Sequence, residues 1–166
     1  NLSWNELTSK SIEALAQCGS LTGLTTLILD ANDIGDEGMH ALAGSKTLSR
    51  LKNLSLTKNQ IGDSGALALI KSTNLSKLST LDLELNLVGK ERLTKFPDGT
   101  ATASLSRLNL RRNQMNDDTV LDWLQTGAFA PLKHLNLGWN KIGDKGIVAF
   151  AKSPMLSGLE QLMLDS

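Results

Sequence analysis

The chain has 166 residues, of which 17 are Lys or Arg, 17 are Asp or Glu and 33 are leucine. Its net charge of zero gives no overall field that would draw it to nucleic acid or to an anionic membrane. No apolar stretch reaches the roughly 18 residues that a membrane-spanning helix needs, and the N-terminus lacks the pattern of a signal peptide.

The leucines follow a repeat. A segment of the form L-x-x-L-x-L-x-x-N begins at Leu24 and recurs every 27 residues. The period divides the chain into a partial repeat over 1–23, repeats over 24–50, 51–77, 78–104, 105–131 and 132–158, and a partial repeat over 159–166. Both ends fall inside a repeat without the polar caps of terminal repeats, so we expect a single domain that is a fragment of a longer chain.

Each repeat is predicted to form a short strand and then a helix. Leu27 and Leu29 alternate with polar residues, which is typical of a strand with one buried face, so Thr26, Ile28 and Asp30 are expected on the open face. In the second half of the repeat the apolar spacing changes to three and four. We expect this helix to place Ala41 and Leu42 against the same core.

The link between strand and helix carries recurrent small and polar residues. The first glycine is expected to need a positive φ, and it stands at Gly35, Gly62, Gly89 and Gly143. The following aspartate is predicted to cap the helix that it begins, at Asp36, Asp63 and Asp144. A second glycine is expected to let helix and strand approach closely, at Gly38, Gly65 and Gly146.

A column of asparagines marks the end of each strand. A buried amide side chain at this place can bond backbone groups of neighbouring coils, so we predict a structural ladder. Its members are Asn5, Asn32, Asn59, Asn86, Asn113 and Asn140.

Repeats three and four depart from the pattern in their second halves. Phe96-Pro97-Asp98-Gly99 is a strong turn signal, and 100–104 is small and polar, so a short helix and a loop are expected. Drift on the outer side is favoured over a functional loop. Gly127 and Pro131 are interpreted as ordinary punctuation before the next strand.

This pattern resembles the leucine-rich repeat family, and the Gly-Asp-x-Gly half is similar to the ribonuclease-inhibitor-like subfamily. The resemblance implies an α/β, right-handed solenoid shaped as a horseshoe arc, with parallel strands on the concave face and helices on the convex face. The regular 27-residue period looks more like bacterial repeat proteins than like vertebrate ones.

The open-face positions vary between repeats and therefore carry the functional prediction. Residues 27 apart are neighbours, which places Glu84 beside Arg111, Asp82 beside Asn109, and Arg107 beside His134. Arg and Trp are frequent in interface hot spots, and Arg112 beside Trp139 fits a cation–π pair. The alternative is a solvated ion pair with Trp139 packed along the rim. The predicted partner-binding residues are Asp82, Glu84, Leu85, Arg107, Asn109, Arg111, Arg112, His134, Asn136 and Trp139.

No residue pattern indicates catalysis or metal binding. Cys18 is the only cysteine and is interpreted as neither a disulfide partner nor a nucleophile, and it weakly favours a reducing compartment. His40 and His134 fall in different halves of the repeat, which does not suit a metal site. The Gly-Asp-x-Gly strings recur with the period and do not match a phosphate-binding loop. Three arginines raise an RNA groove as an alternative, which the neighbouring acids disfavour.

We therefore expect a non-enzymatic module that binds a protein partner through its concave face. No cofactor, metal, nucleic acid, membrane or small-molecule ligand is expected. The resemblance leaves two alternatives, a regulator of a small GTPase and the substrate-recognition part of a bacterial effector or ubiquitin-ligase-type protein. The expected location is the cytoplasm, or a host into which such an effector is exported.

Overall fold

The computed structural model describes residues 1–91 and 104–165. Six three-residue strands line one side: β1 (Thr26–Ile28), β2 (Asn53–Ser55), β3 (Thr80–Asp82), β4 (Arg107–Asn109), β5 (His134–Asn136) and β6 (Gln161–Met163). The α-helices are α1 (Ser9–Ala16), α2 (Gly35–Gly44), α3 (Asp63–Ile70), α4 (Asp117–Thr126) and α5 (Asp144–Lys152). Short 3-10 turns span Gly19–Leu21 and Pro154–Leu156. The predicted turn at Phe96–Gly99 lies outside the described residues.

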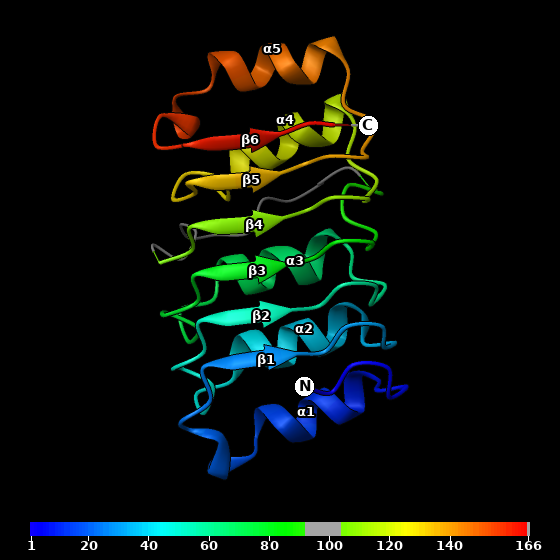
Figure 1. Cartoon of the computed structure of the whole chain (residues 1–166), viewed down its shortest axis with the longest axis vertical. Helices are drawn as coiled ribbons and strands as arrows, with labels where there is room; N and C mark the ends of the chain where they lie inside the picture. The colour runs from blue at the N-terminus through cyan, green and yellow to red at the C-terminus, as the bar shows by residue number, and fades with distance from the viewer. Residues whose placement is uncertain (92–103, 166) are drawn as a thin grey trace.

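The strands stack in chain order as one parallel sheet, β1 to β6 (Figure 1). Each register step is one 27-residue period, so Leu27 pairs with Leu54 and Leu54 with Leu81. The open-face pairs follow the same step: Arg107 is beside His134, and Asp82 is beside Asn109. The predicted α/β solenoid of strand–helix repeats is therefore the observed fold.

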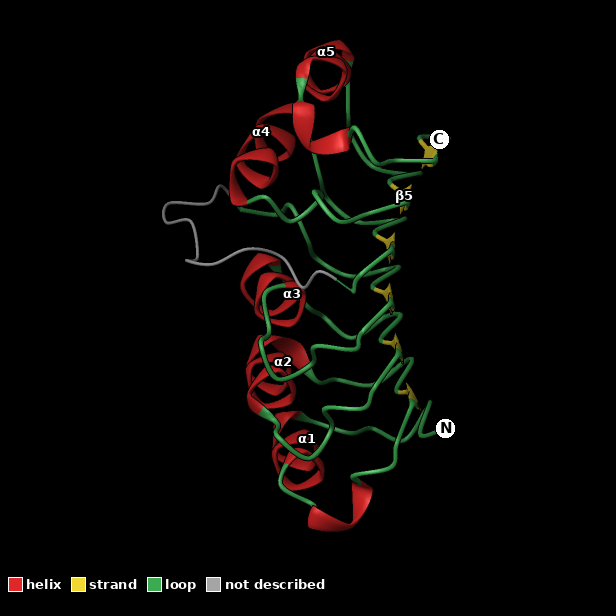
Figure 2. Cartoon of the chain, turned by 90° about the vertical axis from the view of Figure 1, so that its left-hand side faces the viewer, coloured by secondary structure: helices red, strands yellow, loops and turns green. Residues whose placement is uncertain are grey.

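The strands and helices form two layers with the core between them. Figure 2 shows the strand side as a shallow concave surface and the helices on the opposite, convex side. Leu27 and Leu29 are buried, while Thr26 on the open face of β1 is exposed, as the alternation predicts. On the helical side Met39 and Leu42 are fully buried. Ala41 is only half-buried, so the prediction that it shares the core with Leu42 is wrong in that residue.

Asparagine side chains cross-link neighbouring coils at the strand ends. The Oδ1 atom of Asn86 accepts hydrogen bonds from the amides of Asn59 (2.9 Å) and Ile61 (3.0 Å) of the preceding coil. Its Nδ2 donates to the carbonyls of Leu56 and Leu83. Asn32, Asn113 and Asn140 make the same type of bonds. Asn59 differs, because its buried Oδ1 has no partner among the described residues.

The aspartates of the turn cap a different helix from the one predicted. Asp36 accepts from the amide of Gly62 (2.7 Å), which precedes α3 in the next coil. Asp117 likewise accepts from Gly143 (2.7 Å) and Gly146 (3.0 Å) at the start of α5. None of α2, α3 and α5 has a side-chain cap from its own N-cap residue. The prediction that Asp36, Asp63 and Asp144 cap their own helices is wrong, because the starts of α3 and α5 instead donate to a carboxylate of the preceding coil.

The Asp36 carboxylate explains why glycine stands at positions 62 and 65. Gly35 and Gly89 have positive φ (65° and 83°), but Gly62 and Gly143 do not (−95° and −104°), which corrects half of the prediction. A Cβ at Gly62 would lie 3.1 Å from Asp36 Oδ2. A Cβ at Gly65, in the second glycine column, would meet Asp36 and Met39 within 3.0 Å. The second glycine therefore permits close packing on the preceding turn and helix, not on a strand.

A left-handed backbone position precedes every ladder asparagine. Six residues 27 apart have φ between 53° and 59°: Trp4, Ala31, Lys58, Leu85, Arg112 and Trp139. Non-glycine residues rarely adopt this conformation, and here it follows each of the strands β1 to β5 and also occurs at Trp4. The sequence predicted that Arg112 lies beside Trp139, but it gave no sign of this backbone conformation. We call these six positions the strand-exit row.

A buried tryptophan of α4 is hydrogen-bonded to α3. Trp123 of α4 donates from Nε1 to Asp63 Oδ1 of α3 (2.6 Å), 60 residues earlier, and stacks on Phe129 at 5.6 Å. The Asp63 carboxylate also accepts from the Gly89 amide (3.0 Å). Helix α4 has a cap of its own, a capping box between Asn116 and Thr119. No helix among the described residues is long and apolar enough to cross a membrane.

Candidate functional site

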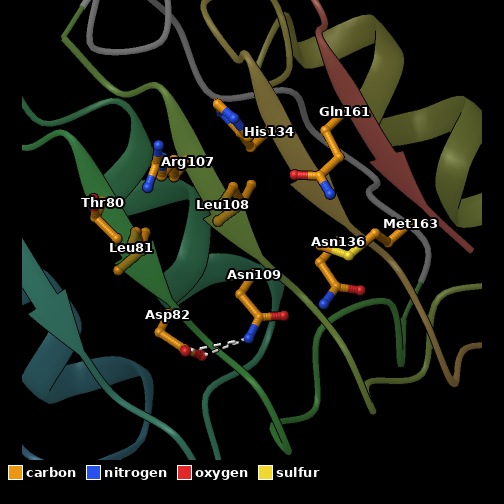
Figure 3. Close-up of a pocket in the computed structure, with 10 residues that line it drawn as sticks. All are labelled: Thr80, Leu81, Asp82, Arg107, Leu108, Asn109, His134, Asn136, Gln161 and Met163. Atoms are coloured by element: carbon orange, nitrogen blue, oxygen red, sulfur yellow. Dashed lines mark hydrogen bonds between the residues drawn. The ribbon is translucent and has the colours of Figure 1, made fainter.

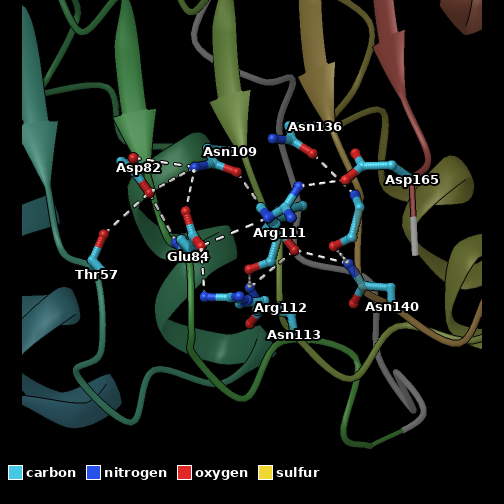
Figure 4. A network of polar contacts seen from close by, with 12 residues as sticks. Thr57, Asp82, Glu84, Asn109, Arg111, Arg112, Asn113, Asn136, Asn140 and Asp165 are labelled. Atoms are coloured by element: carbon cyan, nitrogen blue, oxygen red, sulfur yellow. Dashed lines mark hydrogen bonds and ion pairs between the residues drawn. The ribbon is translucent and has the colours of Figure 1, made fainter.

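The candidate site lies on the strand side over β3 to β6. Each strand contributes two outward residues from its first and last positions, and the strand-exit loops add a further row. The site has a strand-exit end, which holds a network of polar contacts (Figure 4), and a strand-entry end, which forms a pocket (Figure 3).

Asp82 is the centre of the strand-exit network. Its Oδ1 accepts from the amide of Glu84 (2.9 Å) and from Asn109 Nδ2 (3.1 Å), and Thr57 Oγ1 donates to the same atom at 3.4 Å. Asn109 in turn accepts from the Arg111 amide (3.0 Å), and Asn136 accepts from the Gly138 amide (3.0 Å). A side chain that bonds the amide two residues later fixes the chain where each strand ends.

Two arginines lie over this network. Arg111 donates from Nη1 to Asp165 Oδ2 at 2.6 Å, and its Nε is 3.8 Å from Glu84 Oε1. Arg112 places Nη1 3.8 Å from the same Glu84 oxygen. Glu84 therefore holds both guanidinium groups close together, while Arg112 keeps 44% of its side chain exposed. The predicted neighbours Glu84 and Arg111 lie side by side.

Trp139 stands beside both arginines at the edge of the site. The guanidinium of Arg112 lies 5.1 Å from the ring centroid and that of Arg111 5.6 Å, within the range of a cation–π contact. The residue is still 52% exposed, and Leu85, two coils earlier in the strand-exit row, is 43% exposed. At the other end of that row Lys58 lies 5.1 Å from the ring of Trp4, which is 75% exposed.

The strand-entry pocket encloses a volume of about 360 Å³ on the open face (Figure 3). Arg107, His134 and Gln161 lie toward one end of it, and Asp82 and Asn109 toward the other. Its lining residues are Thr80, Leu81, Asp82, Arg107, Leu108, Asn109, His134, Asn136, Gln161 and Met163.

Beside the pocket, Lys133 and Glu160 form an exposed ion pair at 2.7 Å. The hydrogen bond from Lys133, and then its charge, lower the pKa of Glu160, with smaller contributions from His134 and Arg107. Burial raises the pKa of Asp63, which the hydrogen bond from Trp123 partly offsets. Asp63 is the buried first residue of α3, on the helical side, so this pKa shift does not concern the candidate site.

The structure divides the predicted site residues between the two ends. Arg107 and His134 line the pocket, while Glu84, Arg111 and Trp139 form the exit end with Leu85 and Arg112. Asp82, Asn109 and Asn136 border both ends. The predicted set did not include Thr57, Thr80, Leu81, Leu108, Gln161, Met163 and Asp165. Gln161, Met163 and Asp165 stand in the same columns as predicted residues, in the last, partial repeat.

The residues with reactive or ligating side chains are not gathered into a centre. His40 lies on α2 and contacts Ser64 Oγ at 2.9 Å, and Cys18 is half-buried in the turn after α1. Within residues 1–91 and 104–165, no group of three or more His, Cys, Asp or Glu residues is placed to hold a metal ion.

A family model described as Leucine Rich repeat matches residues 1–16, 21–43, 49–69 and 130–151. The matched stretches cover α1, β1 with α2, β2 with α3, and β5 with α5. The chain belongs to the leucine-rich repeat family. The unmatched interval includes the third and fourth repeats, where the second half departs from the pattern.

This leucine-rich-repeat chain has no match among curated proteins. Among solved structures, an internalin (inlF) from Listeria monocytogenes is similar over 92% of this chain, with 20% identity and a TM-score of 0.41. The chain spans about half of that internalin, 51% of its length. Membership of the family gives the chain the general character of a protein-interaction module.

Proposed function

We propose that the chain binds a protein partner through its concave strand side, with the strand-exit end of the site as the main contact. The observation that carries this proposal is Trp139. A large aromatic side chain is half exposed, yet two guanidinium groups lie against its ring and its backbone has a fixed left-handed conformation. A Trp already held in place loses little conformational freedom on binding.

The surrounding residues support a protein partner. Arg112 adds a partly exposed cation next to the tryptophan, and Leu85 adds an exposed apolar side chain one coil beyond Arg112, a composition typical of interface hot spots. The acids Glu84 and Asp165 already pair with the arginines. The surface is therefore of mixed charge, unlike the strip of unpaired positive charge that binds a nucleic-acid backbone.

The resemblance to ribonuclease-inhibitor-like repeats suggests narrower forms of this function. One is regulation of a small GTPase, and another is substrate recognition for a catalytic domain of an effector or ubiquitin-ligase-type protein. If the chain stimulates GTP hydrolysis by one member of a panel of small GTPases, the regulatory function is supported.

The experiment compares partner capture by the wild-type chain and by the double variant Arg112→Ala/Trp139→Ala. Ala31 occupies the same strand-exit row with the same backbone conformation, so alanine at 112 and 139 suits the fold. We expect the double variant to lose the captured protein and to keep its unfolding temperature. Trp4→Ala is the matched control, because it removes an exposed tryptophan from the far end of the same row. If the double variant captures the partner as well as Trp4→Ala does, the strand-exit end is not the contact.

A further inference from the structure

The strand-entry pocket presents hydrogen-bond donors that the fold does not use. The two other arginines of the strand side have acidic partners, Asp165 for Arg111 and Glu84 for Arg112. Arg107 is exposed and its guanidinium has no ion pair or hydrogen bond within the described part of the chain. A guanidinium carries five N–H donors and no acceptor, so this end of the pocket selects for an anionic acceptor.

His134 adds a neutral donor beside Arg107. Its Nδ1 is buried and has no hydrogen-bond partner in the described residues, while Nε2 is not among the buried unpaired atoms. A buried N–H without an acceptor is rarer and more costly than a buried lone pair without a donor. A proton on Nε2 avoids such a buried unpaired N–H at Nδ1, so we take Nε2 as the donor that His134 offers.

Asn136 provides a third donor, and the neighbouring coil illustrates what such a donor binds. Asn109 uses Oδ1 for the amide two residues later and directs Nδ2 to both oxygens of Asp82 (3.1 and 3.2 Å). Asn136 uses Oδ1 in the same way, for Gly138, but its Nδ2 has no partner in the described part of the chain. The same row thus binds a carboxylate one coil earlier and leaves the equivalent amide open in the pocket.

We propose that Arg107, His134 and Asn136 bind the carboxylate side chain of an aspartate or glutamate in the partner protein. The inference rests on the proposed function and names the chemistry of the partner. Charge complementarity carries it: Arg107 and His134 place an unpaired cation and a second donor at the entry end, and Asn136 adds its open amide at the last position of the same strand as His134, whereas Asp82, two strands from Asn136, makes the β3 side unfavourable for an anion. The volume of about 360 Å³ accommodates the acidic side chain with adjoining backbone.

The test uses three short peptides that differ at one residue. Acetyl-Gly-Gly-Glu-Gly-Gly-amide is titrated into the isotope-labelled chain and followed by NMR, with the Gln and the phosphoserine versions in parallel. We expect the Glu peptide to shift the Asn136 side-chain amide and the His134 ring signals, and the Gln peptide to bind at least about tenfold more weakly. Equal binding of Glu and Gln peptides would overturn the proposal, and preference for phosphoserine by tenfold or more would assign the pocket to phosphate instead.

Variants separate this site from the strand-exit end. Arg107→Gln is expected to weaken the Glu peptide about tenfold or more, because it removes a charge-assisted hydrogen bond. Lys145→Gln, which removes the same charge from the exposed side of α5, serves as the control and is expected to bind as the wild type does. Unchanged binding by Arg107→Gln would refute the assignment.

The double variant Arg112→Ala/Trp139→Ala is expected to bind the Glu peptide normally. Loss of protein capture by that variant with retained peptide binding separates the two sites. If it captures the partner normally while Arg107→Gln loses the peptide, the proposed main contact fails and the carboxylate pocket stands.

Discussion

On the strand side every coil repeats the same arrangement, whereas on the helical side the arrangement changes from coil to coil. The six strands keep one register, and the left-handed residue and the asparagine recur after each of β1 to β5. Helices α2 to α5 begin in three ways, at a glycine with positive φ for α2, under a carboxylate of the preceding coil for α3 and α5, and with a capping box for α4.

The difference follows from how many backbone groups each side must satisfy. The amides of Asn59 and Ile61 are buried between coils and both donate to the side chain of Asn86, so a change there leaves several groups unpaired. Helix starts on the convex side are near solvent, and several different caps satisfy them at similar free energy. The comparison predicts that equal substitutions cost more on the strand side.

The largest effect is expected for Asn86→Ala. The change removes the acceptor of the Asn59 and Ile61 amides and two donated bonds in a buried site. We expect the free energy of unfolding to fall by about 4 kcal/mol, measured by denaturant titration. Asn53→Ala, which alters an exposed asparagine of β2, is the control and is expected to change it by less than about 0.5 kcal/mol. A loss below about 1 kcal/mol at Asn86 would contradict the argument.

A smaller loss of stability is expected when the hydrogen bond between Trp123 and Asp63 is removed from the helical side. Trp123→Phe keeps the aromatic packing on Phe129 but removes the hydrogen bond to the buried Asp63 carboxylate. We expect a loss of about 2 kcal/mol in the same titration. Trp139→Phe makes the same chemical change at a half-exposed residue and is expected to cost less than about 0.5 kcal/mol. Equal losses at both sites would remove the structural role assigned to the bridge.

The same bridge predicts a pH dependence. Because burial raises the pKa of Asp63 in the folded chain, the folded state retains this proton at a pH where the unfolded chain has released it. The contribution of Asp63 to stability is therefore greatest at low pH and decreases as the pH rises through the raised pKa. Asp63→Asn abolishes this contribution, so the stability difference between wild type and variant should change with pH in that direction. A difference that is constant or rises with pH would contradict the sign.

The smallest effect is expected for the caps between coils. Asp117→Ala removes the acceptor of the Gly143 and Gly146 amides and is expected to cost about 1 kcal/mol. Asp144→Ala removes an exposed aspartate from the first turn of α5 itself and should cost less than about 0.5 kcal/mol. If Asp144→Ala is the more costly change, α5 is capped within its own coil.

The sequence predicted most of the strand side, because a period of two and a repeat of 27 together determine which residues are neighbours. Leu27, Leu54 and Leu81 pair as the spacing requires. The helical side was predicted less well. Asp36 was assigned to the helix that contains it, although its carboxylate accepts from Gly62 at the start of the helix in the next coil. Chain separation alone does not distinguish these two possibilities.

The burial of Trp123 could be predicted from the sequence, but its hydrogen bond could not. It stands three periods after Leu42, in a column of buried residues that also holds Leu69, so its burial was predictable. Its bond to Asp63 was not, because the pair joins coils that are two periods apart. For the candidate site, the columns predicted which residues share the strand side, and side-chain geometry was needed to separate paired arginines from Arg107.

The two kinds of cross-link between coils point in opposite directions along the chain. Asn86 reaches back to the amides of Asn59 and Ile61, whereas Asp63 reaches forward to the amide of Gly89. A chain divided between the second and third repeats would leave unpaired amides on both fragments, on the strand side of one and on the helical side of the other. A shortened version of this protein therefore needs a replacement acceptor at whichever end is newly made, carboxylate on one side and amide on the other.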